Sequence, residues 1–429
     1  MTFSSPTLAR VAKGDLCSGC GLCAAAGGGK VHMAVSRDGF LRPCQTAPLD
    51  AAQEDRVAAA CPGARLRQPT PAGTTDHPMW GPLLQVRSGH AADPEIRRNA
   101  SSGGALSALL VHLLECAEVD YVLQTTADTA LPYGNRTVAS LSRDAVQAAA
   151  GSRYAPSAPL AEIDAHLDGQ GRFAFVGKPC DVAALRALAR IDPRVDAKVP
   201  YMLSFFCAGV PSLDGAREVL QALDVDEAEL AAFRYRGDGW PGYATARRHD
   251  GSTARMSYAD SWGGILSRHV QFRCKICPDG TGGAADVVCA DAWHCDDKGY
   301  PLFEEDDGWS LIVSRTGRGE ELVLRAQEAG ALTARPTPVD AVAQMQPGQV
   351  KRKSLALSRI LGAAAMLRPA PRFDGFHLAR VACGAGLRAN LHSFLGTVRR
   401  IVRPKRRPAA AAPRPAVQPV RSSKLEAAE

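Results

Sequence analysis

The 429-residue sequence lacks any run of about 18 apolar residues, the length that a helix needs to cross a bilayer. Its first residues, Met-Thr-Phe-Ser-Ser-Pro, also lack the basic and apolar regions of a secretory signal peptide. We therefore expect no membrane-spanning helix and a cytoplasmic location. In that compartment many cysteines indicate metal ligands or redox groups, because the cytosol keeps thiols reduced.

Two kinds of binding motif are missing as well. There is no Gly-x-Gly-x-x-Gly stretch, so the composition does not itself reveal a dinucleotide cofactor. No recognisable nucleic-acid-binding module accompanies the basic residues, and we expect no nucleic-acid partner. Cysteine, by contrast, is plentiful, with 13 residues.

Three of these cysteines form the motif Cys17-Ser-Gly-Cys20-Gly-Leu-Cys23. Two-residue gaps put three thiolates on one tight loop, and glycine lets the backbone curl and point its N–H groups at sulfur. The alternatives are a structural zinc knuckle or three free thiols. Zinc sites usually bring cysteines in pairs, so the triplet favours an iron–sulfur cluster.

The fourth ligand of this cluster is not local. Bacterial ferredoxins continue the triplet with a Cys-Pro pair after three residues, but position 27 is glycine here. A distant Cys61-Pro62 follows a predicted helix over residues 50–60, which suggests the remnant of a two-cluster module. Cys44 lacks the following proline and ranks lower. The predicted ligands are Cys17, Cys20, Cys23 and Cys61.

Two strand–loop–helix units occupy the middle of the chain. Residues 172–176 and 201–206 are predicted strands, and each precedes a cysteine-containing loop and then a helix. Alternation of this kind favours a parallel sheet. Cys180 and Cys207 would then lie at the same edge of one sheet, where open α/β sheets bind ligands.

A second strong metal motif is Cys274-Lys-Ile-Cys277, followed by proline. Together with Cys180 and Cys207 it supplies four ligands, enough for a second 4Fe–4S cluster. A zinc site of four cysteines uses the same ligands, so their number does not choose the metal. Cys289 and Cys295 are near in sequence, but Cys289 falls in a predicted buried strand.

Two further stretches are candidates for ligand binding. Ser101-Ser-Gly-Gly104 opens a strongly apolar helix whose bare N–H groups suit a phosphate, although an ordinary serine cap with glycines for close packing explains it equally well. Residues 233–243 gather Arg234, Arg236, Trp240, two tyrosines and three glycines. Such planar groups stack on flat rings, and the plain alternative is a rigid connecting loop.

The C-terminal part of the chain is strongly basic. From residue 351 onward there are 17 Lys and Arg against 3 Asp and Glu, whereas the preceding residues carry 34 basic and 41 acidic groups. Residues 376–403 are predicted to form a basic amphipathic helix. Such a helix lies on an anionic membrane surface or packs on the body, and both interpretations stay open, including peripheral contact with the inner face of a membrane.

In their order along the chain, these motifs resemble the coenzyme F420 hydrogenase/dehydrogenase beta-subunit family, which includes plant 7-hydroxymethyl chlorophyll a reductase. The resemblance covers roughly residues 15–345, and the basic tail lies outside it. Ala290 departs from the family pattern, which usually has glycine before Asp291, and the N-terminal module has ligands for one cluster where some relatives hold two. The matching stretches are 17–23, 102–104, 177–180, 207–209, 236–242, 274–277, 285–287 and 291–293.

The resemblance implies an FAD- and 4Fe–4S-dependent oxidoreductase, with coenzyme F420 as a further candidate cofactor. Electrons from ferredoxin or another redox protein, or from reduced F420, would pass through two clusters and FAD to a small organic substrate. The alternative is a non-catalytic electron-transfer subunit of a larger redox complex. Deazaflavins, porphyrin-like rings, quinones and sugar intermediates all remain candidate substrates.

The resemblance also implies that Ser102, Gly103, Gly104 and Lys178 lie near the flavin, and the expected mechanism gives roles to further residues. Lys178 would favour the anionic reduced flavin by its charge, and Arg236 would shape the substrate pocket, so both are assigned to catalysis. The residues assigned to cofactor binding are Ser102, Gly103, Gly104, Gly177, Lys178, Arg234, Trp240, Asp286 and Asp291.

The expected fold class is α/β in the body and α+β over the whole chain. We expect a ferredoxin-like 4Fe–4S module followed by a flavin-binding body with a mixed or parallel sheet and then a basic tail. The expected boundaries are 1–66 for the module, 67–82 for a linker, 83–170 and 171–345 for the two parts of the body, 346–403 for a basic, partly amphipathic helical extension, and 404–429 for a disordered tail.

Overall fold

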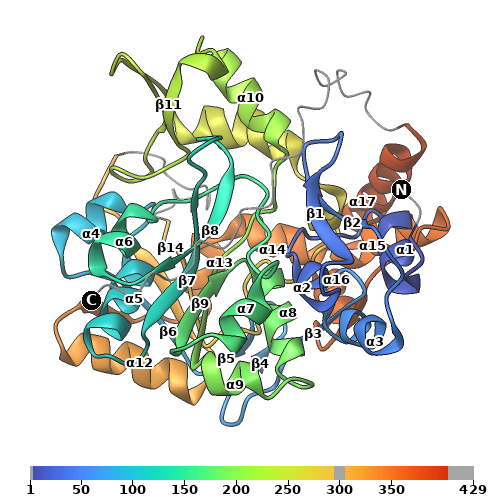
Figure 1. Cartoon of the computed structure of the whole chain (residues 1–429), viewed down its shortest axis with the longest axis horizontal. Coiled ribbons are helices and arrows are strands. Elements are labelled where there is room, and N and C mark those ends of the chain that lie inside the picture. The colour runs from blue at the N-terminus through green and yellow to red at the C-terminus, as the bar shows by residue number, and fades with distance from the viewer. Residues whose placement is uncertain (1–2, 294–304, 404–429) are drawn as a thin grey trace.

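The computed structural model describes residues 3–293 and 305–403. Cys295 and the predicted disordered tail, 404–429, lie outside the described residues. Most of the described chain surrounds one large sheet, with a small N-terminal module on one side (Figure 1). No helix in the described ranges is long and apolar enough to cross a membrane.

The N-terminal module contains three helices and a hairpin. Asp50 caps the third helix by accepting a hydrogen bond from the Gln53 N–H at 2.9 Å, and the helix ends where Cys61 begins the next loop, as predicted. The elements are α1 Pro6–Lys13, α2 Leu22–Ala26, β1 Val31–Val35, β2 Leu41–Gln45, α3 Ala51–Ala60 and β3 Arg65–Arg67.

The large sheet has eight strands in the order β16-β6-β15-β14-β10-β9-β7-β8. Its strands are β6 Gln85–Ala91, β7 Tyr121–Ala127, β8 Asn135–Ser140, β9 Phe173–Gly177, β10 Tyr201–Phe205, β14 Val287–Asp291, β15 Ser310–Ser314 and β16 Leu332–Pro336. The four central strands, β14, β10, β9 and β7, are parallel, and the outer pairings are antiparallel. The predicted mixed α/β fold is therefore confirmed.

Both faces of this sheet are covered, because its central strands are apolar on both sides. Along β9, Phe173 and Phe175 point to one face while Ala174 and Val176 point to the other, as the two-residue period of a strand requires. One face packs against α7 Ile163–Asp168 and α8 Pro179–Leu188, together with residues of the N-terminal module. The opposite face packs against α5 Ala105–Glu115 and α12 Gly317–Glu328.

A second, three-stranded sheet lies at the top of the molecule in Figure 1, beside α10. It contains β11 Leu230–Arg234, β12 Ala244–Arg248 and β13 Thr253–Met256, and α10 spans Leu213–Ala222. The shorter elements are β4 Thr75–His77, β5 Gly81–Leu83, α4 Pro94–Asn99, α6 Arg143–Ala148, α9 Arg194–Lys198, η1 Glu227–Glu229, η2 Ala259–Ile265, η3 Leu266–His269, α11 Phe272–Lys275 and α13 Ala341–Met345.

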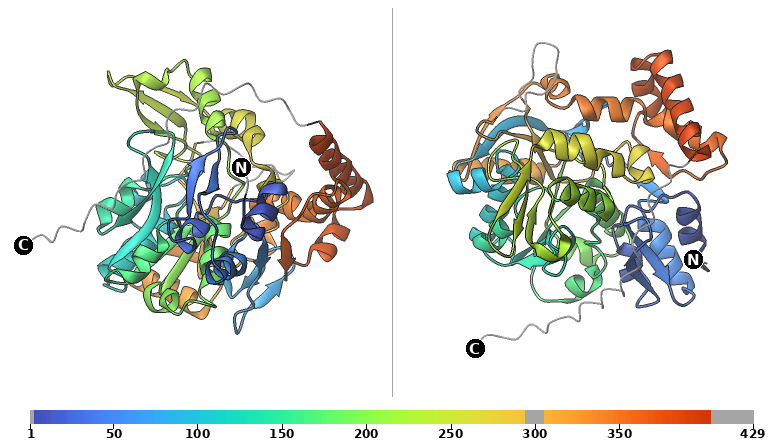
Figure 2. Two further views of the ribbon diagram at one scale, coloured as in Figure 1. Left: turned by 45° about the vertical axis from the view of Figure 1, so that its right-hand side comes forward. Right: turned by 90° about the horizontal axis from the view of Figure 1, so that it is seen from above.

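The C-terminal part of the described chain forms four helices, and the last of them lie together at the edge of the molecule (Figure 2). The four helices are α14 Pro347–Ser354, α15 Ala356–Ala365, α16 Leu378–Gly384 and α17 Leu387–Val402, with β17 Arg372–Asp374 between α15 and α16. The single helix predicted over 376–403 is wrong: it is two helices, because Gly386 adopts a φ of +76° that ends the helical path. Strand β17 pairs in parallel with β3 of the N-terminal module.

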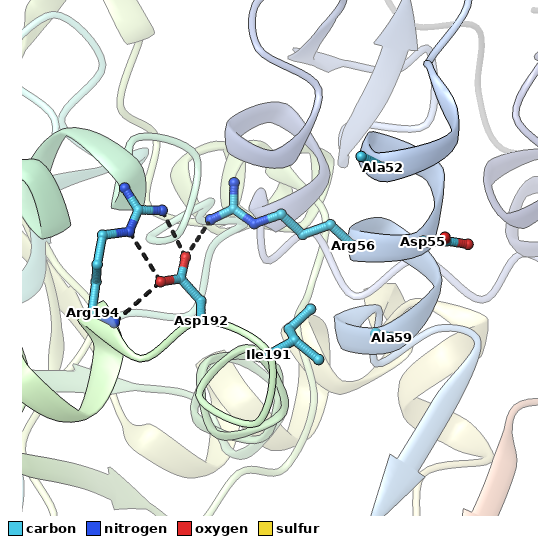
Figure 3. Close-up of a pocket in the computed structure, with 7 residues that line it drawn as sticks. All are labelled: Ala52, Asp55, Arg56, Ala59, Ile191, Asp192 and Arg194. Atoms are coloured by element: carbon cyan, nitrogen blue, oxygen red, sulfur yellow. Dashed lines mark hydrogen bonds and ion pairs between the residues drawn. The ribbon is translucent and has the colours of Figure 1, made fainter.

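Charged side chains join the module to the body beside a shallow pocket at their seam (Figure 3). Arg56 on α3 donates to Asp164 of α7 at 2.7 Å and to Asp192 at 3.1 Å, and Arg194 also binds Asp192. The residues that line this pocket include no cysteine and no predicted cofactor ligand. This pocket therefore belongs to a contact between two parts of the chain.

Candidate functional site

The Cys17–Cys23 loop is curled by two glycines in the left-handed region, Gly19 with φ of +85° and Gly21 with φ of +87°. This curl turns backbone N–H groups toward sulfur, and the Gly19 N–H bonds the Cys17 thiol while the Leu22 N–H bonds that of Cys20. A Cβ at position 21 would lie 2.8 Å from the Ala161 nitrogen, so no larger residue fits. The loop therefore has the N–H donors that a thiolate-bound cluster uses.

Cys61 lies at the end of α3 and faces the same loop. It packs in hydrophobic groups with Cys17 and with Cys23, and the N–H groups of Gly63 and Ala64 bond its sulfur. Burial, followed by the charge of Cys17, raises the pKa of the Cys61 thiol to about 11. Cys44, the other candidate, lies on β2 opposite His32 of β1.

The second set of cysteines comes from three separate segments: Cys180 lies in the first turn of α8, Cys207 lies in a loop, and Cys274 lies on α11 with Cys277 just after it. Cys180 follows β9, Cys207 follows β10, and both strands are neighbours in the parallel part of the sheet, as predicted. The Gly209 N–H donates to the Cys207 sulfur at 3.3 Å, and the Val210 N–H donates to that of Cys274 at 3.4 Å. Burial is the main cause that raises the pKa of Cys207, to about 12, and the neighbouring thiols of Cys274 and Cys277 raise it further.

Within the described ranges, no three His, Cys, Asp or Glu side chains converge on a point where one metal ion would be held. A 4Fe–4S cluster asks for a different arrangement, because each thiolate binds a separate iron corner of a cube. Both cysteine sets suit that arrangement, since each consists of four buried or half-buried thiols and receives backbone N–H hydrogen bonds at sulfur.

Two side chains join the cysteine sets to each other. Arg273, which is 2% exposed, donates to the Pro62 carbonyl at 3.0 Å, so the residue before Cys274 touches the residue after Cys61. Gln271 donates through Nε2 both to the Cys274 sulfur and to the Ser18 carbonyl, each at 3.4 Å. We call Gln271 and Arg273 the junction.

The charge of Arg273 acts on both sets. Burial opposes this charge, but the thiols of Cys277, Cys180 and Cys274 raise the pKa of Arg273 above its ordinary value. The same guanidinium lowers the pKa of Cys17 and Cys61, against the larger effect of their burial. Ile276 fills the remaining space, fully buried in one group with Cys17 and Cys61.

A cavity of about 280 Å³ opens beyond the carboxyl ends of β9, β10 and β14. This volume is at the small end of the range for ligand pockets. Its walls include Gly177 and Lys178 after β9, Cys207 after β10, and Gly104 at the start of α5. Because Cys207 belongs to the second cysteine set and lines the cavity, the two sites share a wall.

Lys178 is the one lysine among the residues that line the cavity. Its Nζ lies 2.7 Å from Asp181 Oδ2 and donates to Ser157 Oγ, also at 2.7 Å. Burial opposes its charge, but the carboxylate of Asp181 raises the pKa of Lys178 above its ordinary value, so the lysine stays protonated. Asp181 Oδ1 is buried with no hydrogen-bond partner among the described residues. The pair thus offers a charged donor and an unused acceptor at one wall.

An aromatic wall closes another side of the cavity. The Arg236 guanidinium binds both oxygens of Asp291, at 2.9 and 2.6 Å, and lies 4.7 Å from the ring of Tyr258 and 4.9 Å from that of Trp293. Trp240 stacks on Trp293 at 4.8 Å and donates to Asp291 at 2.8 Å. Burial opposes the charge of Arg236, but Asp291 raises its pKa above the ordinary value. Arg236 therefore holds this wall together.

The Ser101–Gly104 turn begins α5 at the cavity, but much of it is used for packing. The Ser102 hydroxyl bonds the carbonyls of Ala290 and Trp309 at 3.1 and 3.0 Å. A Cβ at Gly103 would lie 2.6 Å from the Ser310 nitrogen, so that glycine allows α5 to approach the sheet. Ser101, Ser102 and Gly104 line the cavity, and Gly103 does not.

The structure brings together some of the predicted residues and separates others. Asp286 lies at the start of β14, where its carboxylate accepts hydrogen bonds from Met202 N, Arg186 and Thr316. Predicted residues that line the cavity are Ser102, Gly104, Gly177, Lys178, Arg236, Asp291 and Cys207. Predicted cofactor-binding residues outside its lining are Gly103, Arg234, Trp240 and Asp286, and of the eight predicted metal ligands only Cys207 lines it.

Several lining residues escaped sequence reasoning because no motif marks them. Gln124, Asn135 and Ser157 lie on strands or loops of ordinary composition, and they come to the cavity only through the fold. Arg153 and Tyr154 had one weak signal, a polar turn with an Arg beside a Tyr at Gly151-Ser-Arg-Tyr.

Comparison with known proteins gives a consistent result. Residues 86–163 match the family described as "Coenzyme F420 hydrogenase/dehydrogenase, beta subunit N-term", and residues 170–340 match the corresponding C-terminus family. The chain is 26% identical over 262 residues to the coenzyme F420 hydrogenase subunit beta of Methanococcus voltae, covering 59% of this chain and 84% of that protein. It is 24% identical over 294 residues to the F420-dependent formate dehydrogenase subunit beta of Methanocaldococcus jannaschii, covering 67% and 68%.

A solved structure shares the fold. One chain of the F420-reducing [NiFe] hydrogenase complex from Methanosarcina barkeri superposes with a TM-score of 0.52 at 20% sequence identity. The match covers 70% of this chain and 98% of that chain.

Proposed function

Because the chain belongs to the coenzyme F420 hydrogenase/dehydrogenase beta-subunit family, we propose that it is an iron–sulfur flavoprotein oxidoreductase. It takes electrons from ferredoxin or from reduced F420 and delivers them, through two 4Fe–4S clusters and FAD, to an organic substrate. The observation that carries this proposal is the continuous series formed by the first cysteine set, the junction, the second cysteine set and the cavity wall at Cys207.

The first cysteine set is the electron inlet in this proposal. It belongs to the small module, whereas the second set lies between that module and the cavity. The junction supplies a short route of covalent and hydrogen bonds, from Cys61-Pro62 across the Arg273 side chain to Cys274. A second route runs from Ser18 through the Gln271 amide to the Cys274 sulfur.

The cavity residues suit a flavin or deazaflavin ring. FAD would supply the conversion between single electrons and hydride. The Lys178 ammonium favours negative charge on a bound ring, and the unused Asp181 oxygen accepts a hydrogen bond from a ring N–H. The N-terminus of α5, at Gly104 and Ala105, favours a phosphate at the cavity edge by its helix dipole.

Arg236 acts by position in this scheme. Its guanidinium is already shared between the two oxygens of Asp291, and its faces meet Tyr258 and Trp293. It therefore fixes a flat aromatic wall against which a planar substrate or ring stacks and from which water is excluded.

The second candidate function is an electron-transfer subunit whose partner performs the chemistry. The names of the relatives favour it, since they describe beta subunits of F420-dependent hydrogenase and formate dehydrogenase. The cavity next to Cys207 favours the enzyme, because a relay between proteins needs no ligand pocket.

Anaerobic purification tests both candidates. We expect about eight irons and one flavin per chain, with the visible absorption of 4Fe–4S clusters. A colourless, zinc-loaded protein overturns both functions. With the cofactors present, a screen with reduced ferredoxin and reduced F420 separates them: substrate reduction by the isolated chain identifies the enzyme, and electron transfer only to a partner protein identifies the relay.

A matched pair of variants tests the first cysteine set. Cys61→Ser removes a predicted ligand, so the iron content is expected to fall by about half while the flavin stays bound. Cys44→Ser is the control and is expected to keep the full iron content. Loss of iron from Cys44→Ser with retention in Cys61→Ser would reassign the fourth ligand.

A further inference from the structure

The C-terminal helices α15 and α17 pack against each other through polar side chains and leave apolar side chains exposed. In an ordinary amphipathic pair the polar residues face solvent and the apolar ones meet. Here the facing surfaces are polar: Ser358 on α15 binds Asn390 on α17, and Arg359 donates to the Ser393 hydroxyl at 3.2 Å. Ser393 is 8% exposed and Thr397 is 1% exposed, so the polar side of α17 is its buried side.

The apolar side of α17 faces outward. Leu387 is 85% exposed, Leu391 and Leu395 are each 54% exposed, and Val402 is 58% exposed. The leucines follow one another at intervals of four residues, so they line one side of the helix. On the neighbouring helix Leu361 is 52% exposed. We call Leu361, Leu387, Leu391, Leu395 and Val402 the apolar ridge.

Positive charge surrounds this ridge. Arg388, Arg399 and Arg403 are exposed on or directly after the same helix. Between Asp374 and Glu426 the sequence has 11 Lys and Arg and no Asp or Glu. Exposed leucines flanked by arginines, in a segment with no acidic residue, are complementary to an anionic lipid bilayer, where phosphate headgroups lie above the acyl chains.

We propose that the α15–α17 pair docks on an anionic lipid bilayer, with α17 lying in the plane of the interface. The leucines enter the boundary between headgroups and acyl chains, and the arginines bind the phosphates. A second copy of the chain would bring two arginine-rich faces together, so like-charge repulsion disfavours self-association. The proposal is independent of the redox function.

The helix pair that carries the ridge is hydrogen-bonded to segments near both cysteine sets. Arg359 on α15 donates to the Lys275 carbonyl at 2.9 Å, inside the Cys274–Cys277 loop. Arg10 of α1 donates to the Ala370 carbonyl at 2.9 Å, just after α15. Figure 2 shows the last helices of the chain, in red, at one margin of the molecule.

Vesicle flotation of the full chain, with its cofactors, tests the proposal. Vesicles of phosphatidylcholine alone are compared with vesicles that also contain phosphatidylglycerol. We expect flotation with the anionic vesicles only, and at least tenfold weaker binding for the double variant Leu391→Glu and Leu395→Glu. The control is Leu141→Glu, which changes a still more exposed leucine, 68% exposed, on the body and is expected to bind as the unchanged chain does.

Three results would overturn the proposal. The first is no flotation of the unchanged chain with anionic vesicles at low salt. The second is unchanged binding of the double variant together with loss of binding on removal of residues 404–429, which would assign binding to the tail charge alone. The third is a dimer in light scattering without lipid that the double variant abolishes, which would make the ridge an interface between copies. Cofactor absorption and unfolding temperature check that the variants fold.

Discussion

At the scale of single residues, three buried cations stand out at the candidate site. Arg273 lies between two sets of thiols, Lys178 stands at the cavity wall, and Arg236 holds the aromatic residues in place. Each keeps its charge inside the protein because an anion or potential anion lies next to it. The positions of these cations therefore decide where added electrons are most easily held.

Arg273 is expected to set the reduction potential of both clusters. Replacing it with glutamine removes a buried positive charge that stabilises the reduced, more negative state. Both midpoint potentials should fall by about 60 mV or more, a tenfold change in each one-electron reduction constant. Redox titration followed by electron paramagnetic resonance measures both midpoint potentials. Arg273→Lys keeps the positive charge and should therefore leave both potentials close to those of the unchanged chain.

Arg315→Gln is the control for this experiment. Arg315 is another fully buried arginine, but its hydrogen bonds go to the carbonyls of Trp80, Pro82 and Thr281. Its replacement should lower stability and leave both potentials unchanged. Equal potentials in Arg273→Gln and the unchanged chain would remove Arg273 from the electron path.

Lys353 predicts a specific dependence of stability on pH. Burial, with a smaller contribution from the charge of Arg315, lowers its pKa to about 8, whereas Asp279 and Asp76 act in the opposite direction. Its Nζ donates to the Met79 carbonyl at 3.0 Å. Below pH 8 the lysine is charged in both states, so folding bears the full cost of burying that charge. Between pH 8 and about 10.4 the unfolded state binds more protons than the folded one, and stability rises with pH relative to a chain without this lysine.

Lys353→Met should therefore stabilise the protein by about 2 kcal/mol at pH 7, and the gain should shrink as the pH rises from 8 toward 10. Comparing the two chains cancels the titration of the other groups. Thermal unfolding at a series of pH values measures the difference. A gain that grows with pH would contradict the predicted sign.

At the scale of elements, the approach of α5 to the sheet shapes the cavity. Gly103 sits where a Cβ would lie 2.6 Å from the Ser310 nitrogen and 2.7 Å from the Gly89 carbonyl oxygen. Both are backbone atoms of β15 and β6, and they cannot yield as a flexible side chain would. The start of α5, which lines the cavity, therefore depends on this glycine.

Gly103→Ala is expected to lower the free energy of unfolding by about 1–3 kcal/mol and to weaken flavin binding, because α5 must move away from the sheet. Gly317→Ala is the matched control, since nothing lies within 4 Å of its added Cβ at the start of α12. That change should be neutral or stabilise by up to ~1 kcal/mol. Denaturant unfolding and flavin titration measure both, and equal effects of the two changes would refute the packing role.

Elements were more predictable from the sequence than their surroundings. The strand–loop–helix units around Cys180 and Cys207 follow from local alternation, and the parallel pairing of β9 and β10 confirms them. The amphipathic pattern near the C-terminus correctly indicated helix. The pattern could not show which side of α17 is buried. Asn390 and Ser393 face inward because they form hydrogen bonds with Ser358 and Arg359 of α15.

At the scale of the whole molecule, the chain closes on itself around the cysteines. Strand β17 joins β3, and the Arg273 to Pro62 hydrogen bond spans 211 residues. Sequence spacing predicted the two groups of four cysteines but gave no information about their separation. The junction depends on the packing of distant loops, with Ile276 buried against Cys17 and Cys61, and no local pattern encodes such a contact.

This closure predicts that the two clusters interact magnetically. With both reduced by dithionite, their electron spins should couple across the junction, and the low-temperature resonance spectrum of the unchanged chain should be broadened or split. Cys61→Ser should show a single, narrow spectrum from the second set, while Cys44→Ser keeps the coupled one. If the spectra of Cys61→Ser and Cys180→Ser simply add to give that of the unchanged chain, the sets are too far apart to interact, and the electron path needs another intermediate.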